Sequence, residues 1–208
     1  MGIGFVSIGV LLFGGWDLYY STRNYEPFKM PVRMSTGQLR TKQFTVNINT
    51  TYEIEIEVDK RIPFDTLNCL LGMEQDEKTC ATTSSVIDAE WTLRSDGRIV
   101  QHGSSSDDRG GAWAAQTISR EIGHFDGRTG HKYDLEINIL TDGTRLSAGN
   151  PRLIVSVNSG FVEGALFTTG LIVTPAAGIL VLVGVALLLV SVFLAWRRRK
   201  LAHRASLV

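Results

Sequence analysis

The chain has 208 residues, and its 21 Lys and Arg residues balance 21 Asp and Glu residues, so the formal net charge is zero at pH 7. This balance conceals a division, because apolar residues gather at both ends and the charges lie between them. Residues 21–165 carry 16 Lys and Arg against 20 Asp and Glu, a net charge near −4. An acidic middle excludes the clustered basic surface of a nucleic-acid-binding protein, so we expect no nucleic-acid partner.

Residues 1–20 predict an N-terminal transmembrane anchor. No charged residue precedes Asp17, and Trp16, Tyr19 and Tyr20 resemble the aromatic belt at a membrane interface. A cleaved signal peptide is the alternative, but the segment lacks the basic start and the small-residue cleavage site that such peptides need. We expect Asp17 to reach the same interface, and pairing with a partner protein is a second interpretation.

The segment 21–42 is expected to be an extended linker, because Pro27 and Pro31 favour extended backbone and cannot donate to a strand ladder. An edge strand entering near Val32 is the alternative. Residues 43–160 then predict a β-rich domain, since helical periodicity is almost absent and turn residues recur at short intervals.

The clearest predicted strand covers residues 52–58, where apolar side chains alternate with Glu53, Glu55 and Glu57. A period of two indicates a strand with one buried and one solvated face. We expect the three glutamates to lie on the solvated face. A cation site formed by this row is the alternative.

Cys69 and Cys80 are the two cysteines of the chain, and an even pair in an exported domain indicates a disulfide. The bond would close a loop of about 12 residues and contribute about 3 kcal/mol in the chain-entropy model. Two free buried thiols are the alternative. A short helical turn is expected just before this loop, over Phe64–Leu71.

Asp-Gly pairs mark the predicted turns of the domain. Ser95-Asp96-Gly97 predicts a hairpin, because both central positions tolerate a positive φ. Further turns are expected at residues 126–130 and 142–143. About seven strands joined in this way favour a membrane-anchored all-β fold, an antiparallel β-sandwich of the immunoglobulin-like or jelly-roll kind, although the Cys–Trp–Cys spacing of a true immunoglobulin domain is missing.

Histidines and acidic residues near turns are the candidates for metal chemistry: His102, His124, His131, Asp107, Asp108 and Asp126. No pair among them has the i, i+4 or H-x-E spacing of a metal motif, so we interpret them as surface residues and expect no metal and no cofactor. The serines at residues 104–106 lack the surroundings of a catalytic elbow and indicate a flexible polar loop. We therefore expect no catalytic residue and no enzyme.

Residues 166–196 predict the second transmembrane helix. The stretch Leu171–Trp196 has no charged residue, and at about 1.5 Å per residue it is long enough to cross a bilayer of about 30 Å. Pro175 indicates either a first-turn position or a kink in a longer helix. Small residues at a spacing of four predict close helix packing: Gly170, Thr174 and Gly178.

A basic tail, residues 197–208, follows this helix. Trp196 is expected at the membrane interface, and the tail begins with Arg197, Arg198, Arg199 and Lys200. Basic residues that flank a span favour the cytoplasmic side. We therefore expect both termini in the cytoplasm and the β-domain in the periplasm or outside the cell.

This organisation predicts a two-pass cell-envelope protein whose sandwich makes protein–protein contacts, as an accessory subunit of a membrane complex. Its expected partners are the lipid bilayer and a protein, either membrane subunits or an exported protein. A membrane-tethered immunity or inhibitor protein against an exported toxin is one alternative. A domain that binds a glycan or small ligand is another, with Trp113 as the expected ligand contact because it lies in a polar loop.

Overall fold

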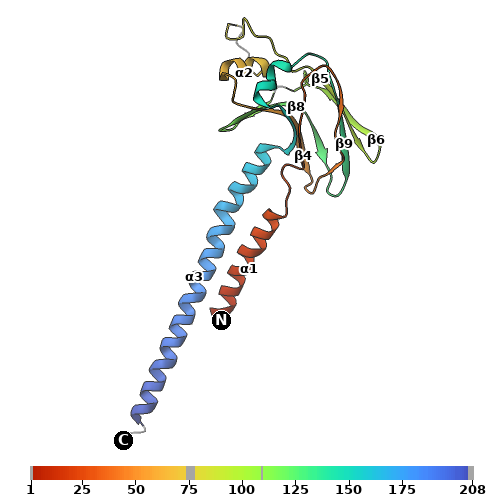
Figure 1. Ribbon diagram of the computed structural model, residues 1–208. Coiled ribbons are helices and arrows are strands. Elements are labelled where there is room, and N and C mark those ends of the chain that lie inside the picture. The colour runs from red at the N-terminus through yellow and green to blue at the C-terminus, as the bar shows by residue number, and fades with distance from the viewer. Residues whose placement is uncertain (1, 74–77, 109, 206–208) are drawn as a thin grey trace. The chain divides into compact units, whose positions relative to one another are not determined.

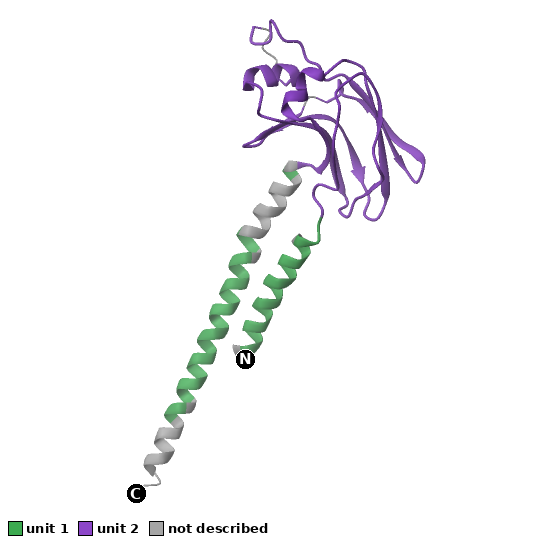
Figure 2. Cartoon of the chain, viewed as in Figure 1, with its two compact units in different colours: residues 1–23, 159–208 green, residues 24–158 purple. Residues whose placement is uncertain are grey.

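The computed structural model describes residues 2–73, 78–108 and 110–205, and the chain divides into two compact units (Figure 2). The first, here called the helical unit, comprises Met1–Arg23 and Ser159–Val208. The second, the β unit, comprises Asn24–Asn158.

The helical unit contains helix α1, Gly2–Ser21, and helix α3, Ser159–Ala205 (Figure 1). The helices meet at Gly9, where a Cβ atom would lie 2.7 Å from the side chain of Val181 and 3.0 Å from the carbonyl oxygen of Ala177. Glycine therefore allows the close approach of the two backbones at this point.

Helix α3 contains one stretch, Thr174–Leu194, whose 21 residues and mean hydropathy of 3.0 suffice to cross a membrane by length and composition. The apolar part of α1, Ile3–Tyr19, is shorter. Helix α3 starts earlier and ends later than the predicted 166–196, and Pro175 lies inside it, as in the second of the two alternatives. The single helix Ser159–Ala205 therefore includes the residues before Pro175 that the first alternative made a separate lead-in.

The β unit consists mostly of two antiparallel sheets. Sheet A has the strand order β1-β10-β4-β8-β7, and sheet B has the order β2-β9-β5-β6, with β3 also paired to β9. The strands of sheet A are β1 Phe28–Pro31, β10 Arg152–Val157, β4 Thr50–Asp59, β8 Thr117–Gly127 and β7 Gly111–Trp113. Those of sheet B are β2 Gly37–Arg40, β9 Lys132–Ile139, β5 Ala89–Ser95, β6 Arg98–Ser104 and β3 Phe44–Thr45.

The expected linker, residues 21–42, differs from the structure, because two of its segments are strands. Strand β1 pairs with β10, and β2 pairs with β9, so both belong to the β unit. Both are edge strands, bonded on one side only. An edge position accommodates Pro31, since its missing amide hydrogen can face away from the ladder.

Aromatic rings from both sheets pack together in the interior. Phe125 of sheet A stacks on Tyr52 at 5.5 Å between ring centroids and meets Tyr133 of sheet B at 5.3 Å. Helix α2, Phe64–Leu71, adds a buried face that includes Leu67 and Leu70. The helix therefore covers part of the core where the two sheets alone would leave it open to water.

Local turn signals agree with the structure. The β5–β6 hairpin turns at Asp96 and Gly97, which have φ angles of 51° and 79°. Helix α2 ends at Gly72, whose φ of 72° is the left-handed cap that glycine adopts without strain. The turn predicted at residues 142–143 leads into a short 3₁₀ helix, η1, Thr144–Gly149.

The solvated face predicted for the glutamates of β4 is wrong for Glu55, which is only 8% exposed. Strand β4 is the central strand of sheet A, with β10 on one side and β8 on the other. Side chains of both neighbours therefore flank the row, and Glu55 accepts hydrogen bonds from Ser119 at 2.6 Å and from Ser156 at 2.9 Å.

Candidate functional site

The outward face of sheet A carries a row of carboxylates that divides into two halves. In the first half, Arg152 contacts Glu57 at 2.8 Å and Asp59 at 2.7 Å, and Lys29 lies 3.1 Å from Glu57. Burial alone would raise the pKa of Glu57, but hydrogen bonds from Lys29 and Arg152 hold that pKa below its ordinary value. This half of the row is therefore neutralised.

In the second half the basic group against the carboxylates is a histidine, His124. The carboxylates of this half are Glu53, Glu55, Asp108 and Glu121. Among the described residues, none of the four forms an ion pair with a lysine or an arginine. Burial and then the charge of Glu55 raise the pKa of Glu53, although a hydrogen bond from Asn158 opposes the shift. This half, here called the acidic patch, is the candidate functional site.

A β-bulge in β8 creates the patch. Gly123 pairs with Ile54, but the next pair joins Glu121 to Glu55, so Ile122 is an extra residue on this strand. Ile122 is fully buried, and Gly123 also faces the interior. Because two successive residues point inward, Glu121 and His124 both emerge on the outer face although they are three positions apart.

The loop that carries Asp108 is held by Arg120, a side chain only 4% exposed. Its guanidinium donates to the carbonyl oxygen of Ser105 at 3.0 Å and of Gly110 at 3.5 Å. The amide of Glu121 also donates to the oxygen of Gly110 at 2.9 Å. These bonds tie both ends of the loop to the sheet and bring Asp108 next to the bulge.

Three side chains that could bind a metal ion come together beside the bulge. His124 Nδ1 lies 3.0 Å from Asp108 Oδ2 and 3.4 Å from Glu121 Oε1, and all three ligand atoms lie within 4.8 Å of one another. Gly110 abuts the carboxylate of Glu121, so any side chain at position 110 would collide with it. The three groups, here called the Asp-Glu-His cluster, form a compact set of oxygen and nitrogen ligands.

The three groups of the cluster shift one another's pKa values because they are close together and partly buried. Burial, followed by the hydrogen bond and the charge of Asp108, raises the pKa of Glu121 to about 7. The hydrogen bond with Asp108 raises the pKa of His124, against a smaller opposing effect of burial. Burial alone would raise the pKa of Asp108, but its hydrogen bonds, first that with His124, keep the pKa below its ordinary value.

The candidates identified from the sequence included His124 and Asp108 of this cluster but not Glu121. The structure unites His124 with Asp108 but leaves the other candidates elsewhere. Asp107 accepts a bond from the amide of Ser104, Asp126 accepts one from Thr51, and His131 stacks on Tyr133. Glu121 was missed, because strand alternation places residues three apart on opposite faces and nothing local in the sequence reveals the bulge.

The two cysteines lie at disulfide distance, with Cα atoms 5.5 Å apart. Cys69 is buried in α2, and Cys80 lies in a turn after residues 74–77, which are outside the described part of the chain.

Trp113 lies at the end of edge strand β7 and is 59% exposed. Its indole N–H donates to the side-chain oxygen of Asn68 at 3.3 Å, which leaves the ring available on the surface.

Residues predicted at the membrane interface lie in the helices. Trp16 and Tyr19 contact each other with ring centroids 5.6 Å apart, and Arg23 lies over the ring of Tyr19 at 3.9 Å. Asp17 and Arg197 are exposed, as is Trp196. The side chains of the remaining predicted residues lie outside the described part: Tyr20, Gly170, Arg198, Arg199 and Lys200.

Thr174 and Gly178, predicted for helix packing, are exposed in this chain. No atom beyond the helix itself lies within 4 Å of the position of a Cβ on Gly178. The contact with α1 uses Gly9, Ala177 and Val181 instead. Packing of the predicted residues against a helix of another protein stays a prediction.

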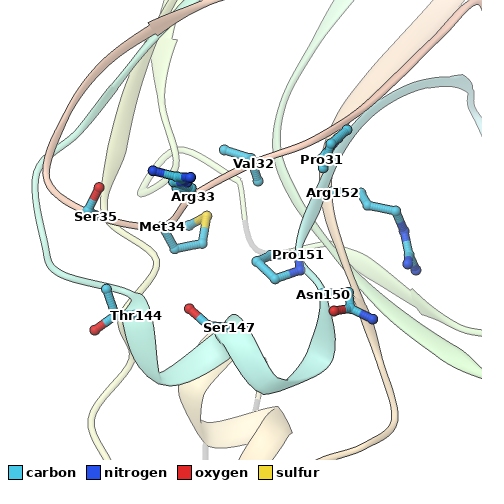
Figure 3. A pocket seen from close by; sticks show the side chains of 10 residues that line it. All are labelled: Pro31, Val32, Arg33, Met34, Ser35, Thr144, Ser147, Asn150, Pro151 and Arg152. Atoms are coloured by element: carbon cyan, nitrogen blue, oxygen red, sulfur yellow. The ribbon is translucent and has the colours of Figure 1, made fainter.

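A hollow of about 590 Å³ lies beside η1, between residues 31–35 and 150–152 (Figure 3). Figure 3 shows Val32, Met34 and Pro151 around its centre, with Arg152 extending away from them. Because Arg152 already pairs with Glu57 and Asp59, the lining offers mainly apolar surface and small polar groups. A small, weakly polar ligand suits such a lining, to which Arg33 adds one cationic group.

No model of a protein family matches this sequence, and no curated protein matches it. Among solved structures, the chain is similar to a crystal structure of a protein from Sulfurospirillum deleyianum, with a TM-score of 0.44 and 9% sequence identity. The match covers 64% of this chain and 97% of that chain. A likeness at this level carries no conclusion about activity or partners.

Proposed function

We propose that this chain is a non-enzymatic cell-envelope protein, anchored in a membrane, whose exported β-sandwich contacts another protein. The sandwich arrangement is supported by the packing of residues from both sheets in one core. Trp91 of sheet B packs against Gly123 of sheet A, and the Phe125 and Tyr133 rings meet between the sheets. Two sheets that share one core are the layers of a sandwich.

The observation that carries the proposal is the apolar exterior of the helical unit. Leu182, Leu189 and Val192 of α3 are 70%, 66% and 66% exposed, and Leu11 of α1 is 73% exposed. A helix without a polar side has no stable place in water, so lipid or other helices must cover it. The apolar stretch of α1, Ile3–Tyr19, is shorter than the roughly 20 residues of a typical span, and we propose that contact with α3 stabilises it in the bilayer.

The disulfide and the basic tail support the orientation. Disulfides persist in oxidising compartments, so Cys69 and Cys80 favour an exported β unit. The tail that begins at Arg197 favours the cytoplasmic side. Both termini then lie in the cytoplasm.

Membrane-impermeant maleimide labelling tests this orientation. In a variant with both native cysteines replaced by serine, a cysteine at the exposed Thr144 should react in intact cells. A cysteine at the exposed Arg197 should react only after permeabilisation. Labelling in the reverse pattern would refute the export of the β unit.

The acidic patch supports a protein partner with a basic surface. Carboxylates without lysine or arginine partners steer and orient a positively charged surface. Such a partner fits an accessory subunit of a membrane complex, in which the exposed Thr174 and Gly178 contact a neighbouring helix.

The test is a pull-down of the tagged full-length protein in a mild detergent, with mass spectrometry of the bound proteins. The paired substitution Glu53→Gln and Asp108→Asn should release the partner. The matched pair Glu26→Gln and Asp142→Asn, which removes two exposed charges outside the patch, should retain it. Retention by both pairs would exclude the patch as the docking surface.

Two other functions rest on particular observations. An immunity or inhibitor protein fits the same acidic patch, because an exported basic toxin would be complementary to it, and a single soluble partner in the pull-down would favour it. A glycan or small-ligand binding domain fits the exposed ring of Trp113 and the hollow beside η1. Binding of a glycan that is lost in Trp113→Ala, with folding intact, would favour that function.

A further inference from the structure

The Asp-Glu-His cluster has the spacing of a metal centre. Ligands at about 2.0–2.2 Å from a tetrahedral zinc ion lie roughly 3.3–3.6 Å from one another. The separations of 3.0 Å and 3.4 Å from His124 Nδ1 to the two carboxylates are close to that range. Small rotations of exposed or half-buried side chains would bring all three ligand atoms onto one ion.

The chemical types of the three ligands, one imidazole and two carboxylates, limit which metal ions the cluster can bind. Calcium and magnesium prefer oxygen ligands alone, whereas an imidazole with carboxylates suits zinc and its first-row neighbours. We propose that Asp108, Glu121 and His124 bind a divalent transition-metal ion of the zinc class, which keeps at least one coordination position for water or for a side chain of a partner. This inference does not depend on the proposed protein contacts.

A second observation points to a bound cation. The ligand oxygens of Asp108 and Glu121 lie within 4.8 Å of each other, although both groups are acids. Two carboxylates at this separation repel each other, and a cation between them removes the repulsion. The adjacent Glu53 and Glu55 add negative charge, so the electrostatic potential favours a cation at this position.

The surroundings also hold the ligands in place before any ion arrives. Arg120 fixes the loop of Asp108 through the carbonyl oxygens at both ends. Gln101 of β6 donates to the carbonyl oxygen of His124 at 2.8 Å, which ties the ligand strand to the other sheet. Because the backbone of both ligand segments is supported, binding requires little ordering of the chain.

The experiment uses the full-length protein in detergent, purified with a tag that contains no histidine and stripped with a chelator. Zinc chloride is titrated by calorimetry, with cobalt(II) absorption as a second readout of the coordination geometry. Both cysteines are in the disulfide, so thiols do not compete for the ion. The expected result is one zinc ion per chain and a visible cobalt spectrum of imidazole–carboxylate ligation.

Substitution of each ligand separates this site from incidental binding. His124→Asn, Glu121→Gln and Asp108→Asn should each weaken zinc binding at least about 10-fold. The controls His102→Asn and His131→Asn should leave the affinity unchanged. His124 is 57% exposed in its side chain, so its replacement should not prevent folding, which circular dichroism verifies.

Three results would overturn the inference. The wild-type protein binds no zinc, or the ligand variants bind as tightly as the wild type, or calcium binds as tightly as zinc. In the first case a proton shared among His124, Asp108 and Glu121 accounts for the cluster without a metal.

Discussion

Trp91 of β5 lies against the backbone of Gly123 in β8, where a Cβ atom would fall 2.5 Å from Cζ2 of the indole and closer still to its nitrogen. Gly123 and the extra residue Ile122 both face the interior, which is why Glu121 and His124 emerge together outside. The same two residues of β8 thus serve the packing of the core and the geometry of the Asp-Glu-His cluster.

Gly123→Ala should therefore destabilise the β unit by about 1–3 kcal/mol, because the added methyl group has no room beside Trp91. Thermal unfolding of the full-length protein in detergent measures the effect. Gly97→Asn is the control, since that hairpin position has open space and a φ that asparagine tolerates. If Trp91 causes the collision, Trp91→Phe should recover part of the loss in the double variant.

Arg120→Met should also destabilise the β unit, by about 1–3 kcal/mol, because it removes the guanidinium that donates to the carbonyl oxygen of Ser105 and one of the two donors to that of Gly110. The amides of residues 104–108 should then exchange their hydrogens faster, as mass spectrometry can measure. The exposed Arg145→Met serves as the control. Unchanged exchange in the loop would show that other contacts hold it.

Replacement of both Cys69 and Cys80 by serine should lower the free energy of unfolding by about 3 kcal/mol, because the unfolded chain regains the freedom of a 12-residue loop. Denaturant unfolding of the protein with and without reductant gives the same comparison by a second route. A reductant that lowers the stability of the wild type but not of the double variant would confirm the disulfide. Equal responses would argue against it.

Acid should remove the stabilising effect of Arg152. The pKa of Glu57 is held below its ordinary value of 4.5 in the folded state, so its contribution is present above that pH and is lost as the pH falls through the lowered value. Arg152→Gln should therefore lower the melting temperature at pH 7, and the gap to the wild type should narrow below about pH 4.5. A gap that is constant with pH would mean that Arg152 acts through packing alone.

Much of the fold was predictable where the signal is local. The apolar helix at residues 171–196, the helix Phe64–Leu71, the hairpin at Asp96-Gly97 and the cysteine pair each depend on residues close together in the chain. Helix periodicity, turn chemistry and cysteine spacing are properties of short segments, so the sequence carries them in full.

The burial of Glu55 and the two strands in residues 21–42 depended instead on strands that are distant in the sequence. Glu55 is buried because β10 and β8 flank its strand, and residues 28–31 and 37–40 are strands because β10 and β9 pair with them.

The sequence by itself determined the two apolar helices, the β-rich middle and the pairing distance of its two cysteines, since local composition and spacing suffice for each. Only the tertiary structure decided that Glu121 and His124 share a face with Asp108. That arrangement requires a one-residue shift in the pairing of β4 with β8, and the shift is tied to the contact of Trp91 with Gly123 across the core. Contacts between distant segments set the register of a strand, and the register decides which side chains meet.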